Sequence, residues 1–308
     1  MTTTGLGSAS PLRGRLAALS AHLLVALVAL VAIGGATRVM EAGLACPDWP
    51  LCYGSLLPGR QMNLQVFLEW FHRLDAFVVG VGLVVLAAVS CWCRRQLPAV
   101  LPGLTLAAAA LVALQGLLGA LTVTLLLPFS VVTAHLVTAL LLVALLSACT
   151  QALLVAPGEP MHALKPQPGL ASAWPWLTGA VALVVLAQCA LGGLMASQWA
   201  AGSCLASGDG CGWLLAHRLG ARGAGLMVLM LAGLSLWRRP QERPLAALAA
   251  ALVLGQIVLG VLALRLSLSV PAVTVAHQIG AALLVAVLAA LVVRSALASF
   301  APRLNGHG

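Results

Sequence analysis

Charged residues are scarce in this sequence, and their scarcity excludes most classes of soluble protein. Only 7% of the 308 residues are Asp, Glu, Lys or Arg, and just seven are acidic. A soluble domain typically carries about 25% charged residues, because its surface has to face water. This chain cannot cover a water-exposed surface, so most of its surface is expected to face lipid.

Aromatic residues are also few, at 5%, which bears on the net charge of +9. Excess positive charge suggests nucleic-acid binding where basic and aromatic residues gather together. Here the basic residues stand singly or in pairs near the ends of apolar segments, a pattern that membrane topology explains better. We therefore expect no nucleic-acid partner and a lipid bilayer as the surroundings.

Apolar residues supply what charge and aromatics do not. They make up 62% of the chain, and the mean hydropathy is +1.07. A spanning helix needs about 20 mostly apolar residues. Eight such helices are predicted, at residues 16–37, 66–91, 101–126, 130–154, 174–196, 213–237, 245–266 and 271–295.

The positions of the basic residues predict the orientation of these helices. Ten of the 16 Lys and Arg residues lie on one set of connections or at the termini: Arg13, Arg15, Arg94, Arg95, Lys165, Arg238, Arg239, Arg243, Arg294 and Arg303. Only Arg38, Arg60 and Arg265 lie on the opposite set. By the positive-inside rule the first set is cytoplasmic, and so are both termini, as an even number of spans requires.

The sequence contains an internal repeat whose two copies have the same landmarks in the same order. Each copy has a Gly-Gly pair, two cysteines, a His-Arg pair, a Gln-x-x-x-Gly segment and a second histidine. His217 lies 145 residues after His72, and His277 lies 142 residues after His135. These similar offsets indicate two homologous halves that cross the membrane in the same direction.

The fold predicted from these patterns is an all-α integral membrane protein, with eight transmembrane helices arranged as two tandem pseudo-symmetric four-helix bundles. Residues 1–156 are expected to form the first bundle and residues 174–308 the second. Residues 157–173 between them are expected to be a cytoplasmic linker, since this stretch of the chain is rich in proline.

Four histidines lie near the outer ends of predicted helices, two in each half. A single histidine in a membrane helix is often only a hydrogen-bonded packing residue. Polar residues are costly in a bilayer, however, and four at repeated positions indicate function. Facing helices can present two imidazoles to one iron atom, so each half is predicted to hold one heme. The predicted iron ligands are His72 with His135 and His217 with His277.

Zinc is the competing interpretation of these histidines. It favours four protein groups, or three and a water molecule, in a tight tetrahedron. Small residues near the histidines leave room for a broad planar group instead, and they favour heme: Gly116, Gly119, Gly255 and Gly260.

Glu69 distinguishes the two halves. It precedes His72 by three residues, so its carboxyl lies on the same helical face, beside the predicted iron. The matching position in the second half is Leu214. We therefore expect reaction in the first half and a supporting role for the second. The alternative is that Glu69 only neutralises Arg73, a part that Asp75 can equally take.

Arg73 and Arg218 each directly follow a predicted iron ligand. We expect these two arginines to bind heme propionates, which tend to point toward the wet end of such a pocket. A structural ion pair is the alternative for both.

Two pairs of cysteines lie in corresponding outer loops of the two halves. The outer compartment is oxidising, so the disulfides Cys46–Cys52 and Cys204–Cys211 are predicted. A structural bridge is one interpretation of these pairs. A redox-active pair is the other, favoured by the short loops and the nearby heme sites.

Three segments of the first half resemble a known family. They are Gly34-Gly35-Ala36-Thr37-Arg38, Gly43-Leu44-Ala45-Cys46-Pro47-Asp48-Trp49-Pro50-Leu51-Cys52 and Glu69-Trp70-Phe71-His72-Arg73. Together with the eight helices, the repeat and the four histidines, they make the whole chain similar to heme A synthases. The cysteine pairs match the bacterial subgroup that carries them. Heme O synthase, the neighbouring enzyme, is a poor match because its Asp-rich diphosphate motifs are absent from this sequence.

The resemblance implies an oxidoreductase that converts the C8 methyl group of heme O to the formyl group of heme A, for cytochrome oxidase assembly. It implies that His217 and His277 bind a heme b cofactor. It further implies that His72 and His135 address the substrate heme, with Glu69 as the nearby catalytic carboxylate.

The same resemblance implies a location and partners. The protein is expected to be a multi-pass protein of the bacterial inner membrane, with the cysteine loops on the outer side. Heme O synthase, cytochrome oxidase assembly factors and an electron donor are the expected partners. The oligomeric state, a homo-oligomer included, is left open.

Two other functions are compatible with the residues alone. A bis-histidine electron-transfer cytochrome would hold both hemes permanently, and it predicts equivalent sites. A heme transporter or chaperone could use the same histidines but gives no reason for an acid in only one half.

Overall fold

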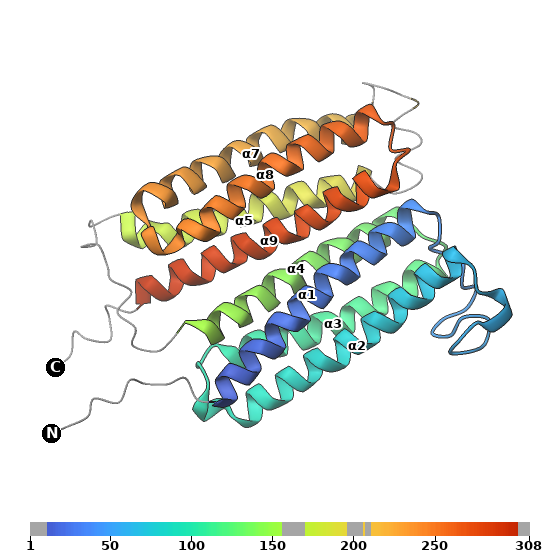
Figure 1. Cartoon of the computed structure of the whole chain (residues 1–308), viewed down its shortest axis with the longest axis horizontal. Helices are drawn as coiled ribbons and strands as arrows, with labels where there is room; N and C mark the ends of the chain where they lie inside the picture. Colours follow the sequence, from blue (N-terminus) through green and yellow to red (C-terminus); the bar gives the residue numbers. More distant parts are fainter. Residues whose placement is uncertain (1–10, 156–169, 196–205, 207–210, 301–308) are drawn as a thin grey trace.

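The structure, a computed structural model, describes residues 11–155, 170–195, 206 and 211–300. Eight long helices account for most of these residues (Figure 1). Each is long and apolar enough to cross a membrane, which confirms the eight predicted spans. The helices are α1 (Pro11–Val39), α2 (Leu64–Trp92), α3 (Leu101–Thr124), α4 (Phe129–Leu154), α5 (Leu170–Met195), α7 (Gly212–Arg238), α8 (Arg243–Arg265) and α9 (Pro271–Phe300). The connections contain the short 3-10 helices η1 (Gly59–Gln61), η2 (Arg94–Gln96) and η4 (Pro240–Glu242).

The helix ends follow local chemistry. Asn63 caps α2, because its side-chain oxygen accepts a hydrogen bond from the backbone N–H of Val66 at 3.0 Å. Helix α1 begins at Pro11, before the predicted residue 16. Proline suits the first position of a helix, where no N–H partner is needed. Arg13 on this added turn is buried, and its Nε donates to the carbonyl of Leu153 at 2.7 Å.

The helices form two four-helix bundles that lie against each other (Figure 1). The first bundle contains α1 to α4, and the second contains α5, α7, α8 and α9. Helices α1 and α4 of the first bundle face α5 and α9 of the second. Corresponding helices run in the same direction, so α1 and α5 begin at the same end of the molecule. The predicted fold class is confirmed.

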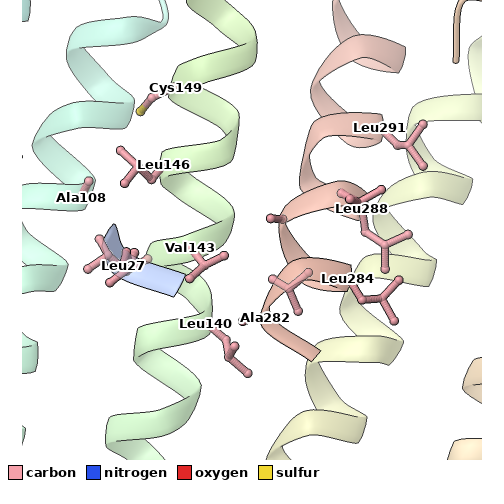
Figure 2. Close-up of a cluster of buried hydrophobic side chains, with 14 of the residues drawn as sticks. Leu27, Ala108, Leu140, Val143, Leu146, Cys149, Ala282, Leu284, Leu288 and Leu291 are labelled. Carbon is pink, nitrogen blue, oxygen red and sulfur yellow. The ribbon is translucent and has the colours of Figure 1, made fainter. Parts of the chain in front are cut away.

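Apolar side chains of the inner helices fill the interface between the bundles (Figure 2). Leu140 and Val143 of α4 are almost fully buried there, and Leu284 of α9 is buried on the side of its helix that faces α5 (Figure 2). In a bilayer, close packing and interhelical hydrogen bonds hold helices together. The hydrophobic effect contributes little free energy there, because lipid tails are as apolar as the side chains. One such bond joins the bundles, from Oγ of Ser147 to the carbonyl of Ala286 at 2.6 Å.

Buried hydroxyl pairs repeat in the two halves. The side chains of Ser20 on α1 and Thr150 on α4 are 2.8 Å apart, and those of Thr178 on α5 and Ser295 on α9 are 3.0 Å apart. Polar groups inside a bilayer need hydrogen-bond partners within the protein. Here the hydroxyl groups of α1 and α4 pair with each other, and so do those of α5 and α9.

The connection between the bundles lies mostly outside the described residues, which stop at 155 and resume at Leu170, where α5 begins. The predicted linker at 157–173 and the domain limits at 156 and 174 therefore stay predictions.

Candidate functional site

The four histidines lie at one end of the two bundles. His72 is on α2, His135 on α4, His217 on α7 and His277 on α9, each within the first three turns of its helix. These four helices begin at the end of the molecule where the loop between α1 and α2 lies (Figure 1). The histidines therefore occupy matching levels in the two halves.

In the first bundle, His72 and His135 lie close together. Their ring centroids are 6.5 Å apart, and the ring planes are inclined at 73°. Two imidazoles bound on opposite sides of one metal ion, at about 2 Å each, have centroids roughly 6 Å apart. The observed separation is thus suited to a metal ion held between the two rings.

Each of the four rings packs against a glycine on a neighbouring helix. A Cβ atom added at any of these glycines would lie close to the Cε1 atom of the ring. In the two closest cases the distance would be shorter than real Cβ contacts essentially ever are. The distances are 2.9 Å for Gly34 and His72, 2.9 Å for Gly192 and His217, 3.3 Å for Gly260 and His277, and 3.6 Å for Gly119 and His135. Glycine therefore allows each ring to lie against the backbone of its neighbour.

Glutamine side chains bind the backbone beside three of the histidines. Each donates from Nε2 to a histidine carbonyl: Gln188 to His217 at 2.8 Å, Gln115 to His135 at 3.0 Å and Gln256 to His277 at 2.9 Å. The sequence prediction had used Gln115 and Gln256 only as repeat landmarks, and it missed Gln188. The available signal was a polar residue inside an apolar helix, which is costly unless it has a partner.

Three imidazole nitrogens have no hydrogen-bond partner among the described residues. They are the buried Nδ1 atoms of His72, His135 and His277. Buried polar atoms are normally paired, so these three nitrogens are available to a group from outside the chain. The described residues contain no group of three or more His, Cys, Asp and Glu side chains that could hold a metal ion. Zinc needs three or four protein ligands, whereas heme iron can take two axial ones, so the residues present fit heme.

A cavity of about 1650 Å³ adjoins His72 and His135 in the first bundle. Pockets for small-molecule ligands usually measure about 300–1,000 Å³, so this one can hold a larger ligand. Most of its wall is apolar and comes from α1 to α4. Its polar side chains include Arg38, Glu69, His72, Arg73, Gln115, His135 and Gln278, the last from α9 of the second bundle.

Glu69 is buried on the wall of this cavity, with 3% of its surface exposed. Its Oε1 accepts a hydrogen bond from Nη2 of Arg73 at 2.5 Å, and its Oε2 accepts one from the backbone N–H of Cys46 at 2.8 Å. The ion pair of Glu69 with Arg73 therefore forms, while Asp75 makes no ion pair with any described residue. This pairing holds the carboxylate in place beside the cavity.

Arg73 also holds the loop between α1 and α2 that contains Cys46 and Cys52, here called the disulfide loop. Its Nη1 donates to the carbonyls of Asp48 and Leu51, both at 2.6 Å, and its Nη2 approaches that of Cys46 at 3.5 Å. With the bond to the carboxylate of Glu69 included, Arg73 directs four of its five guanidinium N–H groups to protein atoms. Binding of a propionate by Arg73, or by Arg218 on α7, stays a prediction.

Cys46 and Cys52 form the predicted disulfide. Inside the loop, the carboxylate of Asp48 accepts hydrogen bonds from the backbone N–H groups of Tyr53 at 2.6 Å and Gly54 at 2.8 Å. The bond from Gly54 is the main cause that holds the pKa of Asp48 below its usual value, with Tyr53 adding to it and desolvation opposing it. Gly54 has φ +70°, a left-handed conformation that glycine adopts without strain.

The second bundle has Leu214 where the first has Glu69. This leucine is buried and packs with Cys211 and Leu264. Cys211 is disulfide-bonded, but Cys204 lies outside the described residues, so their predicted pairing stays a prediction.

The fold and the site define a polytopic membrane protein of duplicated four-helix bundles, in which a histidine pair beside a large cavity can hold a metal-centred ligand. A model of the family described as COX15-CtaA, cytochrome oxidase assembly protein, matches residues 17–289. The match covers most of the chain, which therefore belongs to this family, and the resemblance indicated by the sequence motifs is confirmed.

Individual relatives match smaller parts. The chain is 32% identical over 200 residues to a protein named heme A synthase from Shewanella oneidensis, covering 59% of this chain and 57% of that protein. It is 31% identical over 122 residues to another so named from Erythrobacter litoralis, covering 30% and 36%. A stretch of 65 residues is 38% identical to a protein named protoheme IX farnesyltransferase from Haloarcula marismortui, covering 21% and 13%. The chain thus matches little more than half the length of the first relative and less of the others.

Proposed function

We propose that this protein is a heme A synthase, which oxidises the C8 methyl group of heme O to the formyl group of heme A. The observation that carries the proposal is the cavity of the first bundle, where two histidines and the buried carboxylate of Glu69 meet. The histidine pair, His72 and His135, has the separation needed to hold the iron of the substrate. Family membership and the names of two relatives support this activity.

Glu69 is the residue proposed to act on the reacting carbon. Conversion of a methyl to a formyl group removes four electrons, adds one oxygen atom and removes two hydrogen atoms. The proposed oxidation is of the oxygenase type: O2 is the oxidant and the source of the oxygen atom, and four electrons and four protons from a donor reduce the remaining oxygen to water. Charge developing beside the porphyrin ring is stabilised by a carboxylate that is already held in place, and the effect is strong in an apolar cavity. Its bonds to Arg73 and Cys46 keep the carboxylate in position.

The second bundle is proposed to hold heme b as a resident cofactor, with His217 and His277 as the iron ligands. The residues present fit such a group, because each ring has a glycine behind it and a glutamine bound to its backbone. A bound heme b would supply one-electron redox chemistry. Since Leu214 provides no acid, reaction is assigned to residues 1–156 and cofactor binding to residues 174–308.

The proposal includes an orientation in a bacterial inner membrane, with both termini in the cytoplasm and the cysteine loops outside. Its support is the gathering of Arg13, Arg94, Arg238 and Arg294 at the end where α1 begins, opposite the disulfide loop (Figure 1). Heme O synthase would supply the substrate, cytochrome oxidase assembly factors would receive the product, and a separate electron donor would be required.

The alternatives account for fewer features. An electron-transfer cytochrome needs two equivalent permanent sites, and a transporter needs no acid, so neither explains why Glu69 has Leu214 as its counterpart. A farnesyltransferase, the name of the third relative, would need Asp-rich motifs to bind a diphosphate. The sequence has no such motif among its seven acidic residues.

The test is heme analysis of cells that make heme O and lack any other heme A synthase. Expression of the full chain should yield heme A, identified by mass. His135→Ala should leave heme O unconverted, while His22→Ala, which removes an exposed histidine from α1, should not affect the yield. Unchanged heme O in cells with well-folded wild-type protein would contradict the proposal.

A further inference from the structure

We propose that Arg38 binds a carboxylate group of the ligand in the first cavity. The ligand's identity as a porphyrin, whose carboxylates are its propionates, rests on the proposed function. Recognition of an acidic group at this point follows from the position and partners of Arg38.

Arg38 lies in the last turn of α1, on the cavity wall. Gly34, four residues earlier, is the glycine that packs against the ring of His72. Four residues advance a helix by about 6 Å and return to the same face. Arg38 is therefore one turn further outward than His72, on the side of α1 that faces the cavity.

The guanidinium of Arg38 has most of its hydrogen-bonding capacity left. Within the described residues its side chain makes one hydrogen bond, from Nη2 to Oε1 of Gln278 at 3.1 Å, and no ion pair. A guanidinium carries a permanent positive charge and five N–H donors. A half-buried charge in an apolar cavity is costly without a counter-ion, so a ligand carboxylate stabilises this arrangement through paired, charge-assisted hydrogen bonds.

The other arginine on the cavity wall, Arg73, is already occupied. Four of its N–H groups are directed to the carboxylate of Glu69 and to loop carbonyls. A ligand carboxylate at Arg73 would have to displace these bonds and would meet the negative charge of Glu69. Arg38, by contrast, makes one hydrogen bond, to Gln278, and no ion pair among the described residues.

The second half has no arginine at the corresponding place. Its Gly192-Gly193 pair matches Gly34-Gly35, and the residue that matches Arg38 is Ala196, in the part of the chain that the structure does not describe. The charge at this position is thus particular to the half that contains Glu69.

Gln278 positions Arg38 from the second bundle. Its Oε1 accepts the bond from Arg38, and its Nε2 donates to the carbonyl of Val31 on α1 at 3.2 Å. Gly35 allows this close approach, because a Cβ there would lie 2.7 Å from Oε1 of Gln278. Gln278 also directly follows His277, the predicted heme b ligand, so one turn of α9 contributes to both sites.

The experiment compares two probes on the full-length protein, purified with its resident heme from cells that make no heme O. Iron protoporphyrin IX carries two free propionates, and its dimethyl ester carries none. Each is titrated and followed by the change in the heme absorption spectrum. His135→Ala identifies the part of the binding that occurs in the first cavity.

The wild-type protein should bind the free acid at least about tenfold more tightly than the ester. Arg38→Gln should remove this preference by weakening the free acid alone, and Arg38→Lys should keep part of it, since lysine keeps the charge without the planar fork. Arg60→Gln, which removes an exposed positive charge outside the cavity, should behave as wild type.

Equal affinity of wild type for the two probes, or an unchanged preference in Arg38→Gln, would overturn the assignment of Arg38. These outcomes are independent of the proposed function. If cells expressing the chain form no heme A and the Arg38-dependent preference is present, the proposed function fails and the assignment stands. If heme A forms and the preference is absent, the reverse holds.

Discussion

The backbone N–H of Cys46 donates a hydrogen bond of 2.8 Å to Oε2 of Glu69. A residue of the disulfide loop thus holds the carboxylate that faces the cavity. Arg73 binds the other oxygen of that carboxylate and two carbonyls of the loop. The loop, the arginine and the acid therefore form one unit, and changes in any of them should affect the cavity.

Glu69→Gln should preserve the fold, the heme b of the second bundle and substrate binding, but lower formation of heme A by about 100-fold or more, because the negative charge beside the reacting carbon is lost. The measurement is the heme extracted from cells that make only this variant, which should contain heme O or a partly oxidised alcohol. The matched control is Glu41→Gln, which neutralises an exposed acid just after the end of α1. This variant should make heme A normally. Wild-type amounts of heme A from Glu69→Gln would leave Glu69 with only a structural role.

His217→Ala and His277→Ala should each abolish stably bound heme b, because each removes one axial ligand. His72→Ala and His135→Ala should retain that heme and lose turnover. Absorption spectra of the purified variants decide the matter. A His217→Ala protein with an unchanged low-spin spectrum would show that the ligands are wrongly assigned.

Gly34→Ala and Gly192→Ala should separate the two sites. In each, the new Cβ would lie 2.9 Å from a histidine Cε1, so the ring or the helix must shift, at a cost of about 1–3 kcal/mol. Gly34→Ala should impair turnover and spare heme b, whereas Gly192→Ala should disturb the heme b spectrum.

The controls for these glycines are on the same helices. Gly14 on α1 and Gly179 on α5 have open space where a Cβ would be. Alanine at either position should leave both sites intact and gain up to about 1 kcal/mol of helix stability. If all four variants behaved alike, packing of the rings against glycine would have no functional effect.

Replacement of Cys46 and Cys52 by serine distinguishes the two interpretations of the disulfide. A structural bridge that closes so short a loop contributes about 2 kcal/mol, so its loss should lower the unfolding temperature more than the turnover of the surviving folded enzyme. A redox-active pair predicts the reverse. A non-reducing peptide map should also show Cys204 linked to Cys211, and bonds between the two loops would contradict that pairing.

The disulfide loop should loosen in acid through Asp48. Its pKa in the folded protein lies below the unfolded value of about 4, so the carboxylate stabilises the loop above that pH and stops doing so as pH falls through the lower, folded value. The protection factors of the Tyr53 and Gly54 amides, which say how much slower these amides exchange than those of an unstructured peptide at the same pH, should therefore be high at neutral pH and fall below about pH 4. Asp48→Asn should lower these protection factors at neutral pH and make them less sensitive to acid. A wild-type loop with equal protection at both pH values would contradict this role.

Much of the architecture could be predicted because its causes are local. Apolar runs about 20 residues long specify spanning helices wherever the solvent is lipid, and the repeat of Gly-Gly, cysteines and histidines specifies two similar halves. The disulfide between Cys46 and Cys52 was predictable for the same reason, since the two residues are six apart in one loop.

The polar contacts of the cavity could not be predicted in this way. Gln278 meets Arg38 across 240 residues of sequence, and only the packing of α9 on α1 brings them together. Arg73 donates hydrogen bonds to the backbone carbonyls of Asp48 and Leu51 in the loop. These contacts depend on how the loop folds, and the spacing of residues along a helix does not reveal them. The repeat located the Gly-Gly pairs, but their contact with imidazole rings depends on how neighbouring helices are rotated.

The pairing of the inner helices α1 and α4 with α5 and α9 has a consequence for how the two sites came to differ. Two identical subunits, joined by a twofold axis through the same surfaces, would carry every substitution twice. Glu69 would then recur in both cavities, and Gln278 would reach into both. A single polypeptide that contains both copies is free of this restriction, so Leu214 can stand where its counterpart is an acid, and Leu136 where its counterpart is Gln278. Covalent fusion of the two copies is thus what permits the residues of one site to differ from those of the other.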